Sequence, residues 1–187
     1  MKGNAEQTKA KILAAATQEF SAYGFAGARV DNIAANAGCN KQLIYAYFDS
    51  KQGLFDAVAE THIQAVLEAV PIDAYHLPEY AAQLFDYNRA HPGLIRLVEW
   101  FNLEGINSPR AMALITRSMQ EKVAAVRAAQ AAGAIHSSLP AEEVLTLVLA
   151  ISNAWDVGVH NWGGELDQGA ARLHRQSIIE SVRRLVE

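Results

Sequence analysis

The sequence predicts an all-α protein with a small N-terminal helical domain and a larger helical remainder. Apolar residues recur at intervals of three and four along most of the chain, as they do on one face of an amphipathic helix. The alternating apolar and polar pattern of half-buried strands is absent. Proline and glycine fall between the apolar stretches, where they begin and end helices. Nine helices are expected from these intervals.

The first helix is expected at about residues 5–23. Ile12, Ala16 and Phe20 share one face of it, and Gly24 follows its last turn. Phe25 is expected to fold back into a small core with Phe20.

Residues 29–51 have the spacing of a helix-turn-helix. An apolar stripe through Ile33 indicates a helix of about two turns. Gly38 ends this helix, because glycine takes the left-handed backbone conformation without steric cost. Asn40 then caps a second helix, which packs through Ile44. This arrangement is typical of a DNA-reading unit.

The remaining helices follow from the same signals. Ser50 is expected to cap a helix that runs from Lys51 towards Pro71. Further helices are expected from Leu77 to His91, from Pro92 through Phe101, from Pro109 to Gly133, from Glu142 to about His160, and along a last stretch carrying Leu173, Ile178, Val182 and Leu185. The expected division is a helix-turn-helix domain at 1–50 and a regulatory and dimerisation domain at 51–187.

Composition and charge narrow the class of protein. Hydrophobic residues make up 51% and charged residues 19%, which is ordinary for a folded soluble chain. No apolar leader and no membrane-spanning run are seen, so we expect a cytoplasmic protein without a membrane partner. Residues 1–60 carry six basic and six acidic side chains, so the net charge of −4 belongs to the remainder. Modest DNA affinity per subunit, raised by dimerisation, is expected.

The N-terminal third resembles a known family. The run Gly38-Cys-Asn-Lys-Gln-Leu-Ile-Tyr-Ala-Tyr-Phe-Asp-Ser-Lys51, preceded by Ile-Ala-x-x-Ala-Gly and followed by Gly53-Leu-Phe55, is similar to the N-terminal domain of the tetracycline-repressor (TetR) family. The resemblance spans Thr8 to Phe55. It implies a ligand-responsive transcriptional regulator, usually a repressor, which binds an inverted-repeat DNA operator as a homodimer and is released by a small-molecule effector. The sequence departs from the family pattern at Ala28 and Arg29, where many members carry a Thr or Ser cap, and at Leu43, where Thr is common.

The resemblance implies which side chains meet DNA. Gln42 is the expected base reader, since its amide both donates and accepts, as the major-groove edge of adenine requires. Tyr45, Tyr47 and Lys51 are expected on phosphates, although Tyr47 has an equal alternative as a packing residue. Leu43 is expected against the core rather than on a thymine methyl group. The complete DNA-binding set is Arg29, Asn40, Lys41, Gln42, Tyr45, Tyr47 and Lys51.

A second group of side chains mixes aromatic and polar residues, which is typical of small-molecule pockets. The ligand-binding candidates are Trp100, Phe101, Trp155, Asp156 and His160, with Asn102 and Trp162 as neighbours. Asp156 and His160 are four residues apart and share a helix face, but a zinc site needs a third ligand, so no metal is expected. The alternative is that these aromatics are core residues.

Catalysis and cofactors are not expected. The chain has no Gly-rich phosphate loop, no Gly-x-Ser-x-Gly elbow and no His-Glu-x-x-His motif. Two alternative functions stay open. One is an activator or architectural DNA binder without an effector, and the other is a helical small-molecule-binding protein whose head does not bind DNA.

The last two helices predict how the chain assembles. Apolar residues on the 142–160 helix point in nearly every direction, and the last helix is apolar along 171, 174, 178, 182 and 185. Pairing of both helices with their symmetry mates forms a four-helix dimer interface. The alternative is that one subunit buries both faces by itself.

Overall fold

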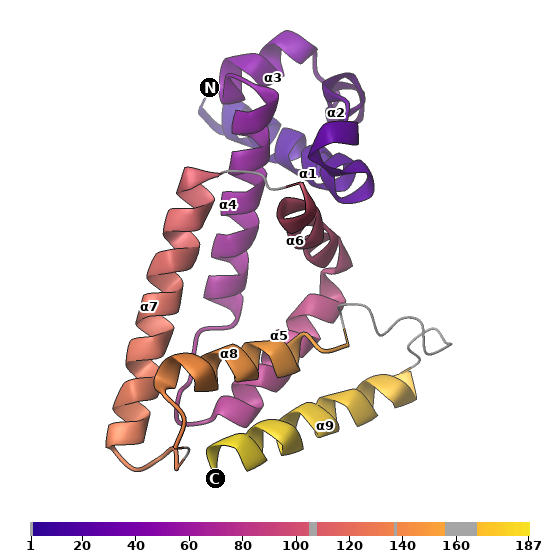
Figure 1. Ribbon diagram of the computed structural model, residues 1–187. Coiled ribbons are helices and arrows are strands. Elements are labelled where there is room, and N and C mark those ends of the chain that lie inside the picture. Colours follow the sequence, from indigo (N-terminus) through magenta and orange to yellow (C-terminus); the bar gives the residue numbers. More distant parts are fainter. Residues whose placement is uncertain (1, 105–107, 137, 156–167) are drawn as a thin grey trace. The chain divides into compact units, whose positions relative to one another are not determined.

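The computed structural model describes residues 2–104, 108–136, 138–155 and 168–187 (Figure 1). Within these ranges the chain forms nine helices and no strand, as the sequence predicts. The helices are α1 (Lys2–Gly27), α2 (Val30–Ala37), α3 (Lys41–Phe48), α4 (Lys51–Ala69), α5 (Leu77–Ala90), α6 (Pro92–Leu103), α7 (Pro109–Ala131), α8 (Ala141–Ser152) and α9 (Gln168–Val186). No described helix is both long and apolar enough to cross a membrane.

The helices group into two compact units. Unit 1 comprises Met1–Ala65 with Pro92–Leu114, and unit 2 comprises Val66–His91 with Ile115–Glu187. The boundaries fall inside α4 and α7, so the units do not follow the expected cut at residue 50. As a division of function, that cut stays a prediction.

Unit 1 has its own core, built around the aromatic side chains of α1 and α4. Phe20 and Phe55 are fully buried, with ring centroids 5.0 Å apart in a T-shaped arrangement. Phe25 packs on both rings, as expected. In addition, α1 packs against α2 and α6. The core also includes Ile12, Ala16, Ile33, Ile44, Phe48, Leu54, Val58 and Leu97.

Unit 2 is centred on α5, which packs against α8 and α9. Its core is mostly aliphatic and includes Leu77, Tyr80, Phe85, Val126, Val144, Val148, Ile178 and Val182. One face of α8 is buried within the unit, whereas Leu147 on α8 keeps 40% and Leu173 on α9 keeps 70% of its surface exposed. Unit 2 by itself therefore does not bury every apolar side chain of α8 and α9.

Two helix ends differ from expectation. α1 continues to Gly27, although Gly24 interrupts its helical geometry with φ 69° and ψ −178°. α8 ends at Ser152 rather than near His160. There the Ser152 hydroxyl donates to the Leu149 carbonyl, and the Asn88 amide donates to Oδ1 of Asn153 over 2.7 Å. Polar side chains at this point hold the backbone in a turn, which apolar periodicity does not reveal.

Candidate nucleic-acid interface

The turn between α2 and α3 has the expected construction. Gly38 is left-handed, with φ 66° and ψ 36°. The backbone N–H of Cys39 donates to the Ala34 carbonyl over 3.0 Å, which closes the end of α2. Oδ1 of Asn40 accepts the N–H of Leu43 at 2.8 Å and caps α3. The helix pair is therefore fixed by local hydrogen bonds as well as by the core.

The two faces of α3 are clearly different. Ile44 and Phe48, four residues apart, are buried in the core of unit 1. Lys41, Gln42 and Tyr45 lie on the exposed side, where Tyr45 keeps 37% of its surface accessible. The burial of one face leaves these three side chains available to a DNA groove.

Two neighbouring residues on α3 are half-buried. Tyr47 packs against the core, with its ring centroid 6.2 Å from that of Phe48, so it has the packing role held open as an alternative. Leu43 is half-buried as well, and its expected position against the core stays a prediction.

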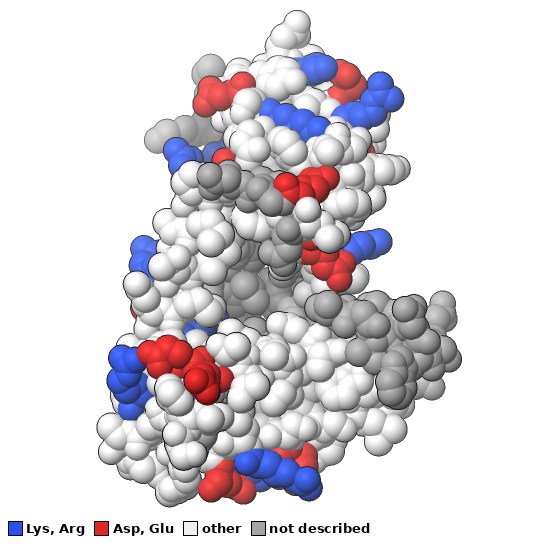
Figure 2. All heavy atoms as spheres, viewed as in Figure 1, with Lys and Arg blue, Asp and Glu red and all other residues white. Residues whose placement is uncertain are grey.

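The basic side chains around this face are already engaged in part. Lys41 Nζ lies 3.0 Å from Oδ1 of Asp31, in an exposed ion pair. Lys51 Nζ lies 4.9 Å from the centroid of the Phe25 ring and 3.4 Å from the Ala26 carbonyl oxygen. Figure 2 shows Lys and Arg interspersed with Asp and Glu over the visible face. Attraction to phosphate therefore depends on individual placed cations rather than on a broad basic field.

Arg29 occupies the N-cap position of α2, and its side chain makes no capping hydrogen bond. Glu19 on α1 supplies the cap instead. Its Oε1 accepts the backbone N–H of Arg29 at 2.9 Å and the side-chain amide of Asn32 at 3.0 Å. Glu19 keeps only 6% of its surface exposed. Glu19 was not among the site residues expected from the sequence, although a carboxylate on the apolar stripe of the first helix, beside Phe20, indicates a buried polar contact.

The link from α3 to α4 is unusually tight. Asp49 has φ 62°, and its N–H donates to the Tyr45 carbonyl over 2.8 Å. The hydroxyl of Ser50 accepts the N–H of Gly53 at 2.9 Å and so caps α4, as predicted. A Cβ atom on Gly53 would lie 2.1 Å from the carbonyl oxygen of Phe48. Only glycine fits this approach of the two helices.

A carboxylate just beyond α6 binds the backbone at the point where the helical geometry of α1 is interrupted. Glu104, which directly follows α6, accepts the N–H of Phe25 at 2.8 Å and that of Ala26 at 3.1 Å. A Cβ on Gly24 would lie 2.7 Å from the Trp100 ring. Phe101 stacks on Phe55, with ring centroids 6.3 Å apart. The candidates Trp100 and Phe101 therefore have packing partners within unit 1.

The other ligand candidates are elsewhere or not described. Trp155 belongs to unit 2, where it packs against the core and stacks on His174 with ring centroids 4.6 Å apart. Asp156 and His160 lie outside the described residues, as do Trp162 and the side chain of Asn102. Across the described ranges, no three His, Cys, Asp or Glu side chains are placed to share a metal ion.

Unit 2 buries two polar groups, the Tyr80 hydroxyl and the Lys122 ammonium. Tyr80 is 1% exposed, and its hydroxyl has no hydrogen-bond partner among the described residues. Lys122 is 9% exposed, with Nζ 5.8 Å from the centroid of the Tyr80 ring. Burial lowers the pKa of Lys122 and raises the pKa of Tyr80 to about 12. Each such group costs stability unless something occupies the space beside it.

Lys122 makes the stability of the protein depend on pH in a predictable direction. Its pKa is lower in the folded state, so the unfolded state binds more protons between that pKa and the usual value for lysine. The free energy of unfolding therefore rises with pH through that window. Lys122→Met should raise stability at neutral pH and remove this rise, as measured by urea unfolding from pH 7 to 9.5. The exposed Lys11→Met is the control; a Lys122→Met protein less stable at pH 7, with the rise intact, would contradict this account.

Comparison with known proteins gives a consistent result over both parts of the chain. Residues 12–58 match the family described as bacterial regulatory proteins of the tetR family, and residues 76–184 match the tetracyclin repressor-like C-terminal domain. The HTH-type transcriptional repressor SCO4008 of Streptomyces coelicolor is 41% identical over 97% of this chain and 96% of its own. The HTH-type transcriptional repressor NicS of Pseudomonas putida is 35% identical over 59% of this chain and 56% of its own.

Solved structures agree with the sequence matches. The putative transcriptional regulator SCO4942 of Streptomyces coelicolor has a TM-score of 0.82 and 32% identity, covering 96% of this chain and 98% of its own. These relatives are transcriptional regulators, not enzymes. With family matches on both parts and a relative aligned over nearly its whole length, the chain belongs to the tetracycline-repressor family of DNA-binding transcriptional regulators.

Proposed function

We propose that this regulator is a cytoplasmic repressor that binds an inverted-repeat operator as a homodimer and leaves it when a small molecule binds. The observation that carries the proposal is the exposed face of α3, which presents Lys41, Gln42 and Tyr45 beside a capped turn. The names of the relatives SCO4008 and NicS support repression.

On DNA, Gln42 reads bases and the other members of the set except Tyr47 hold phosphates. Its position on the exposed face, one residue into α3, suits entry of the helix into a major groove. Asn40 already uses Oδ1 for its cap, so only its amide nitrogen is offered to a phosphate. Arg29 and Lys51 are the remaining cations, Tyr45 adds a hydroxyl, and half-buried Tyr47 contributes mainly through packing.

Two helix faces support a homodimer. Leu147 on α8 and Leu173 on α9 are exposed large apolar side chains. A groove of about 520 Å³ runs along α9 and is lined by Leu173, Gln176, Ser177, Glu180, Ser181 and Arg184. A two-fold pairing of these faces would bury both leucines. A homodimer carries two α3 helices, as two-fold DNA binders need for successive major grooves about 34–36 Å apart.

The buried polar groups of unit 2 support an effector. A small molecule that satisfies the Tyr80 hydroxyl or the Lys122 ammonium would stabilise one arrangement of the body over another. It changes DNA affinity only through its different affinity for the two states. The proposed ligand contacts remain Trp100, Phe101, Trp155, Asp156 and His160. For Trp100 and Phe101, packing inside unit 1 is by itself a sufficient reason for an aromatic side chain.

The experiment that tests the proposal is selection of bound duplexes from a random DNA pool, followed by sedimentation of the winning complex. An inverted repeat bound by two chains is the expected result. An enriched motif without two-fold symmetry, or a complex with one chain, would contradict the proposal that the protein binds DNA as a homodimer. If no motif is enriched, the proposal of sequence-specific DNA binding is contradicted.

Gln42→Ala should weaken binding to the selected operator by roughly 1–3 kcal/mol and leave non-specific binding unchanged, because only base contacts distinguish the two. Fluorescence anisotropy with operator and scrambled duplexes measures both affinities. Gln83→Ala, which removes an exposed amide from α5, is the matched control. An equal loss on both duplexes would show that Gln42 reads no base.

A further inference from the structure

We propose that unit 2 contains a binding site for an oxyanion, that is, for a carboxylate or phosphate group. The site is a groove of about 380 Å³ between the C-terminal end of α5 and the N-terminal half of α9. It is lined by Asp86, Arg89 and Ala90 from α5 and by Ala171, Arg172 and Arg175 from α9. Both helices belong to unit 2, where they pack on each other.

The groove has an excess of positive charge. Nε of Arg175 donates to Oδ2 of Asp86 over 2.8 Å, so these two residues neutralise each other. Arg89 and Arg172 form no ion pair with any residue that the structure describes. Two guanidinium groups therefore line one groove, and neither has a carboxylate partner among the described residues. Like charges that line one groove repel, and an anion bound in the groove reduces that repulsion.

Arg89 lines the groove and has one buried N–H group without a partner among the described residues. Its guanidinium lies over the Phe85 ring, with the central carbon 5.7 Å from the ring centroid. Nη1 of Arg89 is buried, and it has no hydrogen-bond partner among the described residues. A buried N–H of a charged group normally has an acceptor, because leaving it without one costs the full desolvation of that group. A guanidinium can offer two parallel N–H groups, and carboxylate and phosphate oxygens match that geometry.

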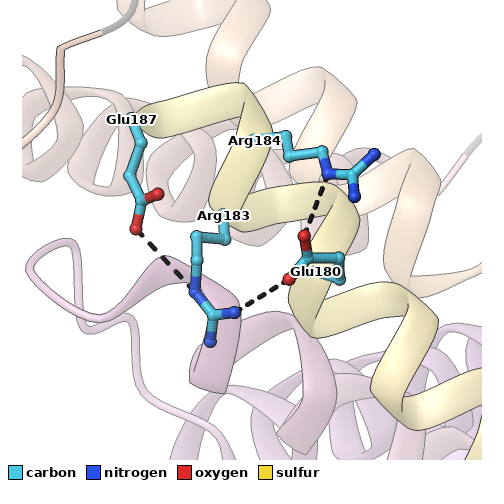
Figure 3. Close-up of polar contacts among 4 residues, drawn as sticks. All are labelled: Glu180, Arg183, Arg184 and Glu187. Atoms are coloured by element: carbon cyan, nitrogen blue, oxygen red, sulfur yellow. Dashed lines mark hydrogen bonds and ion pairs between the residues drawn. The ribbon is translucent and has the colours of Figure 1, made fainter.

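Other arginines on α9 show what a satisfied group looks like in this protein (Figure 3). Arg183 Nη1 and Arg184 Nε each lie 2.9 Å from a carboxylate oxygen of Glu180, and Arg183 Nε also lies 3.8 Å from Glu187. Each of these arginines lies about one helical turn from its carboxylate partner on the same helix. α9 has no acidic residue in its first turn that could serve Arg172 in this way. The excess of positive charge among the described residues is therefore local to the groove and is not a property of α9 as a whole.

The lining also limits what the ligand can be. The volume is at the small end of ligand pockets, which span about 300–1,000 Å³. Ala90 and Ala171 contribute short apolar surfaces beside the charges. The ligand is therefore a small anion with a modest apolar part. Anion binding in this groove needs neither DNA nor a dimer, so it can be tested independently of the proposed function.

The test is calorimetric titration of the full chain, without DNA, with inorganic phosphate and with benzoate, at an ionic strength held constant with chloride. Binding of either anion is the expected result. Preference for phosphate would assign a phosphorylated ligand, and preference for benzoate an apolar carboxylate. Arg89→Gln and Arg172→Gln should each weaken binding by about tenfold or more, since each removes a charge-assisted contact. Arg172 is exposed and has no ion-pair partner among the described residues, so its variant keeps the test informative even if Arg89→Gln unfolds.

Arg184→Gln is the matched control, since it removes the same charge from the same helix while Glu180 keeps Arg183. It should bind both anions like the unmodified chain. Binding no stronger than that of chloride would overturn the proposal. An equal loss of affinity in Arg172→Gln and Arg184→Gln would also overturn it, because it would mean that the anions respond to overall charge rather than to the groove.

Discussion

Gly53→Ala should destabilise the helix-turn-helix region and lower DNA affinity more than any other single methyl group added to unit 1. The new Cβ would lie 2.1 Å from the Phe48 carbonyl oxygen, a distance that no real Cβ contact tolerates. The neighbour is backbone, so no side chain can rotate away. The α3–α4 link must therefore open, at a cost of about 1–3 kcal/mol or more, as for other overpacked sites. Because this link fixes the end of α3, the exposed face that carries Gln42 moves with it.

Urea unfolding and operator affinity measure the two effects. Gly27→Ala is the control, since its Cβ would meet only Cβ of Tyr23 at 3.4 Å, at the end of a helix that alanine favours. That variant should be neutral or slightly stabilised. A Gly53→Ala protein with unchanged stability and DNA affinity would show that the link is soft and that it does not position α3.

Glu104→Gln should give the second large loss. The carboxylate accepts two backbone N–H groups from the residues that follow the break at Gly24, over 2.8 and 3.1 Å. A glutamine offers one oxygen and turns an N–H₂ group towards the second donor. We expect a loss of about 1.5 kcal/mol, at the low end for bonds to charged groups, because the site is partly exposed to water. The C-terminal end of α1, which leads into α2, loses its anchor, so operator affinity should fall as well.

Glu99→Gln is the matched control for this experiment. It removes the same charge from α6, and no contact of the Glu99 carboxylate is seen among the described residues. Differential stability and operator anisotropy should both separate the two variants. If Glu104→Gln and Glu99→Gln behave alike, the carboxylate at 104 acts only through the net charge of the protein.

Local patterns along the chain were sufficient for the helix-turn-helix. Gly38 and Asn40 end and cap their helices as expected, and Ser50 caps α4. Pro92 opens α6, as its fixed φ predicts. In each case the deciding interaction joins residues no more than five positions apart, so the local sequence already contains both partners. Capping residues and turn glycines act on the backbone next to them, and this local effect does not depend on the rest of the fold.

The sequence failed where a contact joins distant segments or where a side chain ends a helix. Glu104 reaches Phe25 across 79 positions of the chain, and no periodicity connects them. Asn88 on α5 binds Asn153 just beyond α8, whose apolar pattern suggested a longer helix.

The sequence by itself determined the helical class, the family and the DNA-reading motif, because apolar periodicity, caps and turn glycines act between near neighbours. Tertiary structure alone decided which carboxylate anchors α1, which glycine is indispensable at the α3–α4 link, and which arginines line a groove with no ion-pair partner among the described residues. Those outcomes depend on how helices cross and how closely their backbones approach. Such distances arise from the packing of whole side-chain surfaces, and pairs of residues far apart in the chain leave no regular spacing in the sequence.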